Sequence, residues 1–275
     1  MFFLIINSYK TYEIDLFSKF IKDLKIIDIS LLKIKEDKLY YEDEIVKLPK
    51  RALFWLGCMT TENDLLIYSY LVENKVSIIN NLEESLLFKD KHHFNLKYTD
   101  KKSKTYNLEE LIDNNELILK DFSFPFILKG SYGSLGKGIF KVNTINEFKH
   151  LIEMIELLDK NFEFFIEEYI DYKEDIRMFI IGDHYYLMNR INKNSFKANY
   201  SQGAHLQIKE DNDKFKQLFK FIRANFDSKV IGVDILIDKD DNYIICELNS
   251  SPGLEGITSL YGEEVILEII KEIYV

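Results

Sequence analysis

Three oxygen-bearing side chains near the carboxyl end of the sequence could together hold a metal ion. Asp234 lies in one β-branched run, and Glu247 and Asn249 lie in the next, beyond a short polar stretch typical of a β-hairpin turn. If Asp238 faces Tyr243 across this turn, the strand register places Asp234 opposite Glu247. Asn249 shares the face of Glu247, because side chains two residues apart in a strand point the same way. Two carboxylates and an amide oxygen suit a hard cation, so the pattern predicts Mg²⁺ held together with substrate phosphates.

Two other interpretations of this hairpin are a solvated edge and a calcium loop. A solvated edge hairpin with outward polar residues would show the same pattern, but the following segment 249–257 is rich in Ser, Pro and Gly, which hold irregular backbone beside a site. Asp238, Asp240 and Asn242 have the first spacings of a calcium loop. Tyr243 occupies the position of the obligatory glycine of such a loop, so the sequence excludes calcium binding there.

A glycine-rich loop between two predicted strands could bind phosphate. The segment Lys129–Gly138 contains four glycines, which let backbone N–H groups approach phosphate oxygens and form an anion nest. Lys129 ends an apolar strand, where a lysine either reaches solvent or meets a phosphate. The loop is no P-loop, because its Gly-Lys pair is followed by Gly138 and a strand rather than by Ser or Thr and a helix. A flexible hairpin loop is the alternative.

Charged residues also interrupt the neighbouring strands. The segment Glu167–Ile170 ends a strand rich in Phe and Ile, and it is either an ordinary edge or a hinge whose backbone groups contact an adenine. Asp175, Arg177 and Arg190 are expected on adjacent strands, where ion pairs at the surface would be the simplest explanation of each residue taken singly.

The order of these pieces along the chain resembles the ATP-grasp superfamily, and most closely its RimK-like ligases. The pieces are a strand lysine with a Gly/Ser loop, E-E-Y-I, D-I-R, an arginine strand, G-V-D-I-L and E-L-N-S-S-P-G-L-E-G-I. The final motif is highly specific, whereas the glycine loop and D-I-R are individually weak but correctly placed. The resemblance runs from about Asn81 to the end of the given sequence.

This resemblance implies an α/β and α+β architecture, the ATP-grasp fold. A small parallel α/β domain would occupy residues 1–80, a central subdomain with the glycine-rich flap residues 81–165, and a C-terminal subdomain with the metal site residues 166–275. The nucleotide would lie between the last two. Alternating short strands and helices in the first part of the sequence independently indicate a parallel α/β domain.

The same resemblance assigns the ATP contacts. Lys91, or the equally near Lys89, would be the first ATP-contacting lysine, and Lys129 would bind the α- and β-phosphates. The other implied contacts are Gly133, Ser134 and Gly136 of the flap, Glu168 and Tyr169 at the adenine, Asp175 at the ribose, and Lys197 and Asn199 near the phosphates.

The family's reaction joins a carboxylate to an amine through an acyl phosphate and releases ADP and phosphate. By resemblance, Asp234, Glu247 and Asn249 would ligate a pair of Mg²⁺ ions, for which Mn²⁺ could substitute. Arg177 or Arg190 would stabilise the tetrahedral oxyanion that follows acyl-phosphate formation. Two alternatives stay open: a kinase on the same fold, which releases a stable phosphorylated product, and a catalytically silent ATP-binding regulatory module.

The composition limits the partners. The hydrophobic fraction of 47% describes a folded protein, and the net charge of −10 argues against non-specific nucleic-acid binding. No apolar run approaches the roughly 18 residues of a membrane span, and the apolar start Met1–Ile6 is expected to be a buried strand. We expect a cytoplasmic enzyme that takes a carboxylate substrate and an amine acceptor, the latter an amino acid, a peptide or a carrier protein. A homo-oligomer is an open possibility.

Hydrophobic periodicity predicts the elements that must position these residues. Helices are expected at 81–96, 145–158, 211–225 and 263–274, strands at 117–119, 124–129, 139–142, 162–170, 176–181 and 185–191, and a mobile loop at 101–105.

Overall fold

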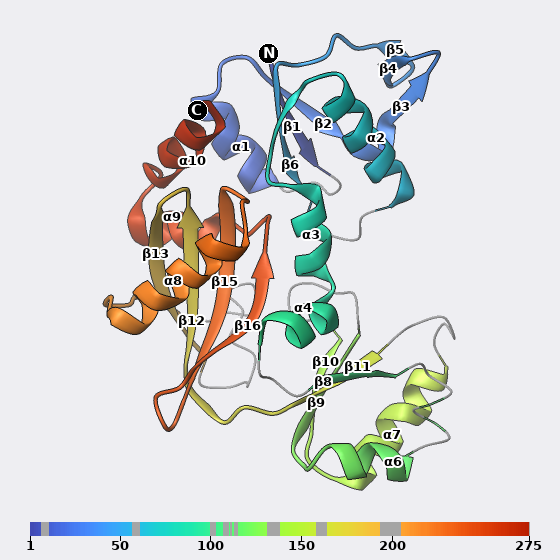
Figure 1. Cartoon of the computed structure of the whole chain (residues 1–275), viewed down its shortest axis with the longest axis vertical. Coiled ribbons are helices and arrows are strands. Elements are labelled where there is room, and N and C mark those ends of the chain that lie inside the picture. The colour runs from blue at the N-terminus through green and yellow to red at the C-terminus, as the bar shows by residue number, and fades with distance from the viewer. Residues whose placement is uncertain are drawn as a thin grey trace.

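Figure 1 shows the computed structural model of the chain, in which two helices, α3 and α4, run between the N-terminal part, the C-terminal sheet and a central unit. The structure describes residues 1–6, 11–56, 61–99, 103–106, 110, 112, 115–130, 138–157, 164–192 and 205–274. The strands among these residues form four sheets. Within the same ranges, no helix is long and apolar enough to cross a membrane.

A four-stranded parallel sheet forms the N-terminal unit. Its strands, in the order β2-β1-β6-β7, are Leu24–Asp28, Phe2–Ile6, Arg51–Trp55 and Ser77–Ile79. The strand β1 is buried along its whole length because alternate side chains face helix α1 (Thr11–Phe20) on one side and helix α2 (Glu62–Glu73) on the other. A small antiparallel sheet of β3 (Leu32–Lys35), β4 (Lys38–Tyr41) and β5 (Glu44–Ile45) follows the short 3₁₀ helix η1 (Ile29–Leu31).

The central unit is an antiparallel sheet covered by two helices. Its strand order is β10-β9-β11-β8, which are Ile139–Val142, Phe126–Gly130, Phe164–Glu168 and Ser103–Tyr106. The helices α6 (Asn115–Asp121) and α7 (Ile145–Glu156) pack their apolar side chains with those of the strands.

Two predictions for this unit are wrong. Residues 117–119 belong to helix α6 rather than to a strand, because a short apolar run has no periodicity that separates the two, and here Ile118 is buried against the sheet. Residues 103–106 form strand β8 rather than part of a loop, since they pair with β11 despite their polar composition.

The C-terminal unit is a five-stranded antiparallel sheet in the order β14-β13-β12-β15-β16. These strands are His205–Ile208, His184–Ile191, Tyr172–Ile181, Val230–Asp238 and Tyr243–Asn249. One face packs on helix α8 (Asp213–Asn225), and part of the other packs on α9 (Glu255–Tyr261) and α10 (Val265–Tyr274). The rest of that second face carries the polar residues of the candidate site.

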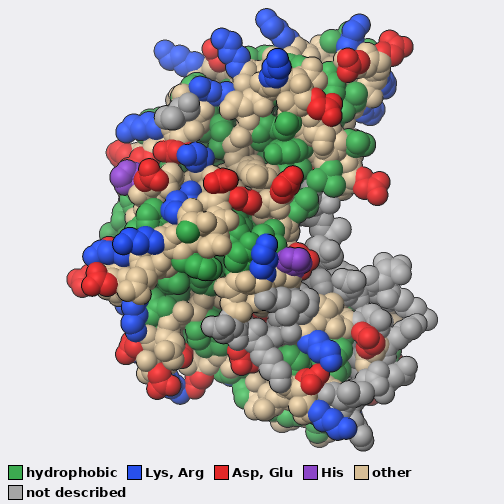
Figure 2. Space-filling model, viewed as in Figure 1, with side chains coloured by type: hydrophobic (Ala, Val, Ile, Leu, Met, Phe, Trp, Pro, Cys, Tyr) green, Lys and Arg blue, Asp and Glu red, His purple; other side chains and the backbone are tan. Residues whose placement is uncertain are grey.

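The N-terminal and C-terminal units share one hydrophobic core. Phe2 and Leu4 of β1 belong to the same buried cluster as Phe179 of β12 and Ile266 of α10. The recess visible in Figure 2 instead lies between this joint body and the central unit. The division into residues 1–80, 81–165 and 166–275 stays a prediction. The shared core shows that the N-terminal and C-terminal units pack directly on each other.

The segment predicted as one helix at 81–96 is two helices, α3 (Leu82–Lys89) and α4 (Lys91–Tyr98). Asp90 ends the first helix and caps the second, because its carboxylate accepts a hydrogen bond from the backbone N–H of His93 at 2.9 Å. Phe88 and Phe94 pack with the core under the C-terminal sheet. This packing brings Lys91, at the start of α4, to the edge of that sheet.

Candidate functional site

The hairpin β15–β16 places Asp234 directly opposite Glu247, as predicted, although by a different register at the turn. Tyr243 pairs with Ile237 and not with Asp238, so that detail of the prediction is wrong. A register shift next to Asp234 adds one residue, Cys246, to the second strand and restores the predicted pairing. The bulge therefore places Glu247 opposite Asp234, on the same face of the sheet.

Arg177 binds Asp234 across two adjacent strands. The two residues are direct partners in the β12–β15 ladder, so their side chains share a face. Arg177 donates from Nη2 to Oδ2 of Asp234 at 2.9 Å and from Nε to Oδ1. This is a bidentate pair in a site where both side chains are mostly buried, which fixes the guanidinium plane.

Arg190 of β13 joins a second carboxylate to the first. Its Nε donates to Oδ1 of Asp175 at 2.8 Å, and its Nη1 donates to Oδ2 of Asp234 at 3.3 Å. Burial raises the pKa of Asp175 to about 6 even though the Arg190 charge acts in the opposite direction. For Arg190, the nearby Asp234 and Asp175 charges outweigh burial and raise the pKa.

Lys91 extends the ion network to Glu247. Its Nζ lies 3.2 Å from Oε2 of Glu247, and its side chain is only 12% exposed. The Glu247 charge raises the pKa of Lys91. Burial opposes ionisation of Glu247, but Lys91, Lys129 and Arg177 together hold the pKa of this carboxyl well below its usual range. Of the two lysines considered from the sequence, Lys91 is thus the one whose contact with the site is described.

Lys129 pairs with a buried carboxylate that the sequence interpretation did not single out. Its ammonium group binds Glu167, which is 2% exposed and also accepts a hydrogen bond from Nδ2 of Asn95 at 3.2 Å. Phe165 is the ladder partner of Lys129, and Glu167 shares the face of Phe165. That alternation was the available signal, because it separates an inward Glu167 from an outward Glu168.

The two predicted adenine contacts lie at the end of β11. Glu168 is exposed, and Tyr169 is half-buried with Nζ of Lys141 3.6 Å from its ring centroid. Lys141 on β10 is a further cation that sequence reasoning missed, since nothing in its local pattern distinguishes it from other surface lysines.

Hydrogen bonds hold the segment after β16 in place. Oδ1 of Asn249 accepts from the backbone N–H of Ser251 at 2.9 Å. Asn80 donates from Nδ2 to the Ser250 carbonyl at 2.5 Å and accepts from the Val230 N–H at 3.1 Å. The irregular backbone expected beside the site is thereby tied to the end of β7.

Gly232 is required by the close approach of two neighbours. A Cβ at this position would lie 2.9 Å from Cβ of Pro252 and 3.1 Å from Nη1 of Arg177. The glycine of the G-V-D-I-L motif therefore leaves the space through which the Arg177 side chain passes. Gly133, Ser134, Gly136, Lys197 and Asn199 lie outside the described residues, and their predicted roles stay predictions.

The oxygen donors of the site fit a cation whose remaining ligands are substrate phosphates. Within the described part of the chain, no group of three or more His, Cys, Asp or Glu side chains could hold a metal ion on its own. Glu247 and Asn249 lie on one strand with the parity of a shared face, and Glu247 is held ionised. Asp234 is engaged by Arg177 and Arg190, so it is available to a cation only after these contacts change. Mg²⁺ sites with one or two carboxylates and substrate phosphates have this donor set.

Comparison with known proteins gives relatives in sequence. The chain is 30% identical over 163 residues to a probable alpha-L-glutamate ligase of Trichodesmium erythraeum, covering 58% of this chain and 54% of that protein. It is 26% identical over 137 residues to the alpha-aminoadipate–LysW ligase LysX of Saccharolobus solfataricus, covering 48% and 50%. The matched part thus spans about half the length of these curated relatives.

Solved structures share the fold over nearly the whole chain. A RimK domain ATP-grasp protein from Sphaerobacter thermophilus aligns with a TM-score of 0.74 and 13% identity, covering 100% of this chain and 99% of that one. The ATP-grasp ligase PsnB, complexed with a phosphomimetic variant of a minimal precursor, Mg and ADP, aligns with a TM-score of 0.67 and 13% identity, covering 98% of both. Residues 83–273 match the RimK-like ATP-grasp domain. The chain belongs to the RimK-like ATP-grasp family.

Proposed function

We propose that this protein is an ATP-dependent ligase that joins a carboxylate to an amine through an acyl phosphate and releases ADP and phosphate. The observation that supports it best is a cluster of four cationic side chains around the carboxylates of the β15–β16 hairpin. The cations are Lys91, Lys129, Arg177 and Arg190. Such a cluster matches a reaction in which the protein mainly stabilises negative charge during phosphoryl and acyl transfer.

These cations are paired with carboxylates in the structure, so the charges neutralise one another. The pairs are Lys91 with Glu247, Lys129 with Glu167, Arg177 with Asp234, and Arg190 with Asp175. Each cation is therefore held at the site by a carboxylate. A polyphosphate would take the place of the carboxylates as the partner of these cations. Because the cationic side chains are already held in place, binding would not have to order them, and the free-energy cost of reorganising the site stays low.

When bound, Mg²⁺ would neutralise charge on the phosphoryl group during transfer. We assign Glu247 and Asn249 as its ligands from this chain, with Asp234 as the third once Arg177 turns to the substrate. A pair of ions, with Mn²⁺ able to substitute, belongs to the same proposal. Mg together with ADP in PsnB supports this choice of cation.

Arg177 and Arg190 are the proposed stabilisers of the anions that develop on the acyl group. The resemblance assigns Asp175 to the ribose, but its bonds to Arg190 support a different role. We propose that Asp175 orients the Arg190 guanidinium. Lys91 and Lys129 are the proposed phosphate contacts, and Glu168 and Tyr169 remain the proposed adenine contacts.

The names of the relatives suggest candidate substrates for this protein. One relative is named for glutamate and another for the carrier LysW, and PsnB is complexed with a precursor. We propose glutamate as the first amine or carboxylate to test, with a peptide or carrier protein as its partner. A kinase and a silent ATP-binding module are the competing functions on this fold.

Hydroxylamine distinguishes these functions, because it intercepts an acyl phosphate and yields a hydroxamate. We expect the protein with ATP, Mg²⁺ and its carboxylate to form hydroxamate when the amine is absent. Glu247→Gln should lower the rate by about 100-fold or more, since one anionic ligand is lost. Glu153→Gln, an exposed change on α7, serves as the matched control and should keep the wild-type rate.

Formation of ADP with a confirmed carboxylate, but without hydroxamate or amide, would favour the kinase. Nucleotide binding with no ADP formed from any carboxylate tried would favour the silent module. Equal rates for Glu247→Gln and Glu153→Gln would contradict the proposed metal ligand.

A further inference from the structure

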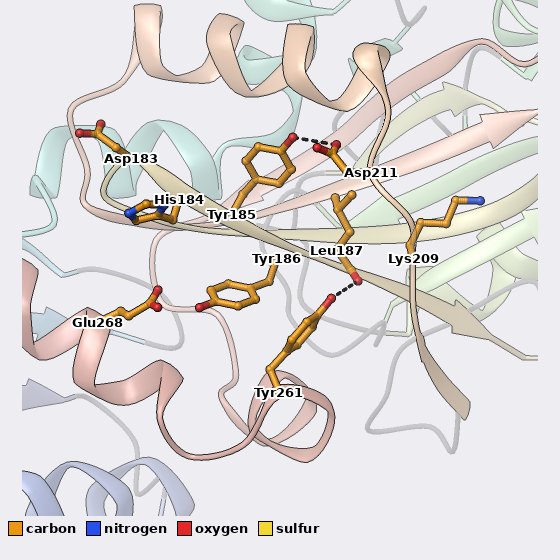
Figure 3. A pocket seen from close by; sticks show the side chains of 9 residues that line it. All are labelled: Asp183, His184, Tyr185, Tyr186, Leu187, Lys209, Asp211, Tyr261 and Glu268. Atoms are coloured by element: carbon orange, nitrogen blue, oxygen red, sulfur yellow. Dashed lines mark hydrogen bonds between the residues drawn. The ribbon is translucent and has the colours of Figure 1, made fainter.

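A pocket of about 440 Å³ lies at the other end of β13 from Arg190 (Figure 3). Its lining comes from the β12–β13 turn, the start of β13, the segment after β14, and helices α9 and α10. The lining residues are Asp183, His184, Tyr185, Tyr186, Leu187, Lys209, Asp211, Tyr261 and Glu268. None of these side chains takes part in the described ion pairs of the candidate site, and Lys209 instead binds Glu174 at 2.5 Å.

The pocket lies beside an open sheet edge. Strand β13 pairs with β12 over its length from His184 to Asn189, but β14 pairs only with Met188–Ile191. Lys209 N–H donates to the Leu187 carbonyl at 3.0 Å and marks the end of this ladder. Because backbone groups alternate in direction along an antiparallel strand, the N–H and C=O of Tyr185 point outward as those of Leu187 do. Among the described residues, no strand pairs with this edge at 184–186.

The edge has a tyrosine on each face. Tyr185 packs on Phe219 of α8, with ring centroids 4.9 Å apart, and Tyr186 packs on Tyr261 of α9, with centroids 4.8 Å apart. A strand added at this edge would have an aromatic wall above and below it. Tyr186 is partly buried and lines the pocket, where an aromatic ring can attract a cation.

The charges of the pocket are mostly negative. Asp183, Asp211 and Glu268 supply carboxylates, while the single lysine of the lining is already paired with Glu174. The Tyr186 hydroxyl interacts with the Glu268 carboxylate, and within the described part of the chain no cation is paired with this carboxylate. A partly buried carboxylate without a cationic partner is costly, and an Arg or Lys side chain would compensate its charge. Figure 3 shows this carboxylate beside the hydroxyl of Tyr186.

We propose that the open edge of β13 binds an extended basic peptide segment of a partner protein. The segment adds a strand beside His184–Tyr186, where it pairs with the outward backbone groups of Tyr185, and places an Arg or Lys side chain against Glu268 and the Tyr186 ring. Main-chain hydrogen bonds provide the attachment, and the carboxylates select for positive charge. This site does not depend on the proposed ligase reaction, because its residues and the reacting groups lie at opposite ends of β13.

The test measures fluorescence anisotropy of labelled hexapeptides with the full chain and no nucleotide. A peptide alternating threonine and arginine should bind, and its glutamate counterpart should not. An arginine peptide with alternate backbone amides N-methylated keeps its charge but loses strand pairing, so it should bind more weakly. Glu268→Gln should weaken the arginine peptide about tenfold or more, because a buried charge loses its partner. Glu153→Gln is the matched control and should change nothing.

Several results would overturn the proposal. These are equal binding by the two Gln variants, equal binding of the glutamate peptide, or no binding of the arginine peptide. Equal binding of the N-methylated peptide, with displacement by free arginine, would mean that the pocket takes small cations and that the strand edge is not used. Thermal unfolding checks that Glu268→Gln is folded; if it is not, Asp183→Asn at the exposed turn replaces it, with exposed Asp15→Asn as its control.

Discussion

At the scale of single residues, the site is a set of opposite charges that hold one another in a low-dielectric environment. Asp175 shows the cost of this arrangement, because burial raises its pKa to about 6 although it binds Arg190. The folded state therefore holds the Asp175 proton more tightly than the unfolded chain does. This contribution to stability is fully present below the ordinary pKa of the carboxyl and is lost as the pH rises through about 6.

Asp175→Asn should remove this pH dependence. The unfolding free energy of the wild-type protein minus that of the variant is expected to fall by about 1–3 kcal/mol between pH 4 and pH 7, at about 1.4 kcal/mol per pKa unit. Urea unfolding of both proteins across this range measures the difference. Two parallel curves would show that Asp175 titrates in the folded protein as it does in the unfolded chain.

How far single residues could be predicted depended on strand parity. Asp234 and Glu247 were predicted to lie opposite each other because both lie in clear β-branched runs, and the structure agrees on the pair. Glu167 was passed over because the resemblance assigned Glu168 to the adenine, although strand alternation separates the two carboxylates. The ion pairs of Arg177 and Arg190 could not be predicted, because they depend on how three separate strands align.

At the scale of elements, the site depends on the space that Gly232 of β15 leaves for the Arg177 side chain of β12. Gly232→Ala would place a Cβ 2.9 Å from Pro252 and 3.1 Å from Arg177. We expect a loss of about 1–3 kcal/mol in unfolding free energy, from the strain of relieving these contacts. Hydroxamate formation should also decrease, because Arg177 must shift away from Asp234.

The matched control for this prediction is Gly253→Ala. Its Cβ would meet only Oε1 of Glu13, at an ordinary distance of 3.8 Å, so its unfolding free energy should stay within about 0.5 kcal/mol of wild type. Denaturant unfolding of the two variants compares them directly. Equal stability of the two would contradict the account of Arg177 passing beneath Gly232.

Elements with sustained periodicity were predicted well, and short ones were not. The amphipathic helix α7 lies where the sequence placed it, because it shows a clear period over its length. The segment 117–119 is a helix and 103–106 is a strand. Three or four residues carry too little pattern to decide, so the sheet and helix that surround them decide instead.

At the scale of the whole molecule, the N-terminal sheet stabilises the side that carries the reacting groups. Besides the shared core, Oε1 of Glu13 accepts from the Leu254 N–H at 3.2 Å, and the Tyr12 hydroxyl lies 2.5 Å from that of Thr258. These contacts fix the segment that follows Asn249. The sequence predicted a separate N-terminal domain but not this role, since contacts between residues so far apart in the chain leave no local pattern.

The fate of the carboxylate oxygen tests the proposed reaction most directly. An acyl phosphate forms when a carboxylate oxygen attacks the γ-phosphorus, and attack by the amine then leaves that oxygen on phosphate. With a carboxylate substrate labelled with ¹⁸O, turnover should therefore release inorganic phosphate that carries one ¹⁸O atom for each amide formed, as read by mass spectrometry. Unlabelled phosphate accompanying the amide, or label retained in a stable phosphorylated product, would contradict the ligase mechanism.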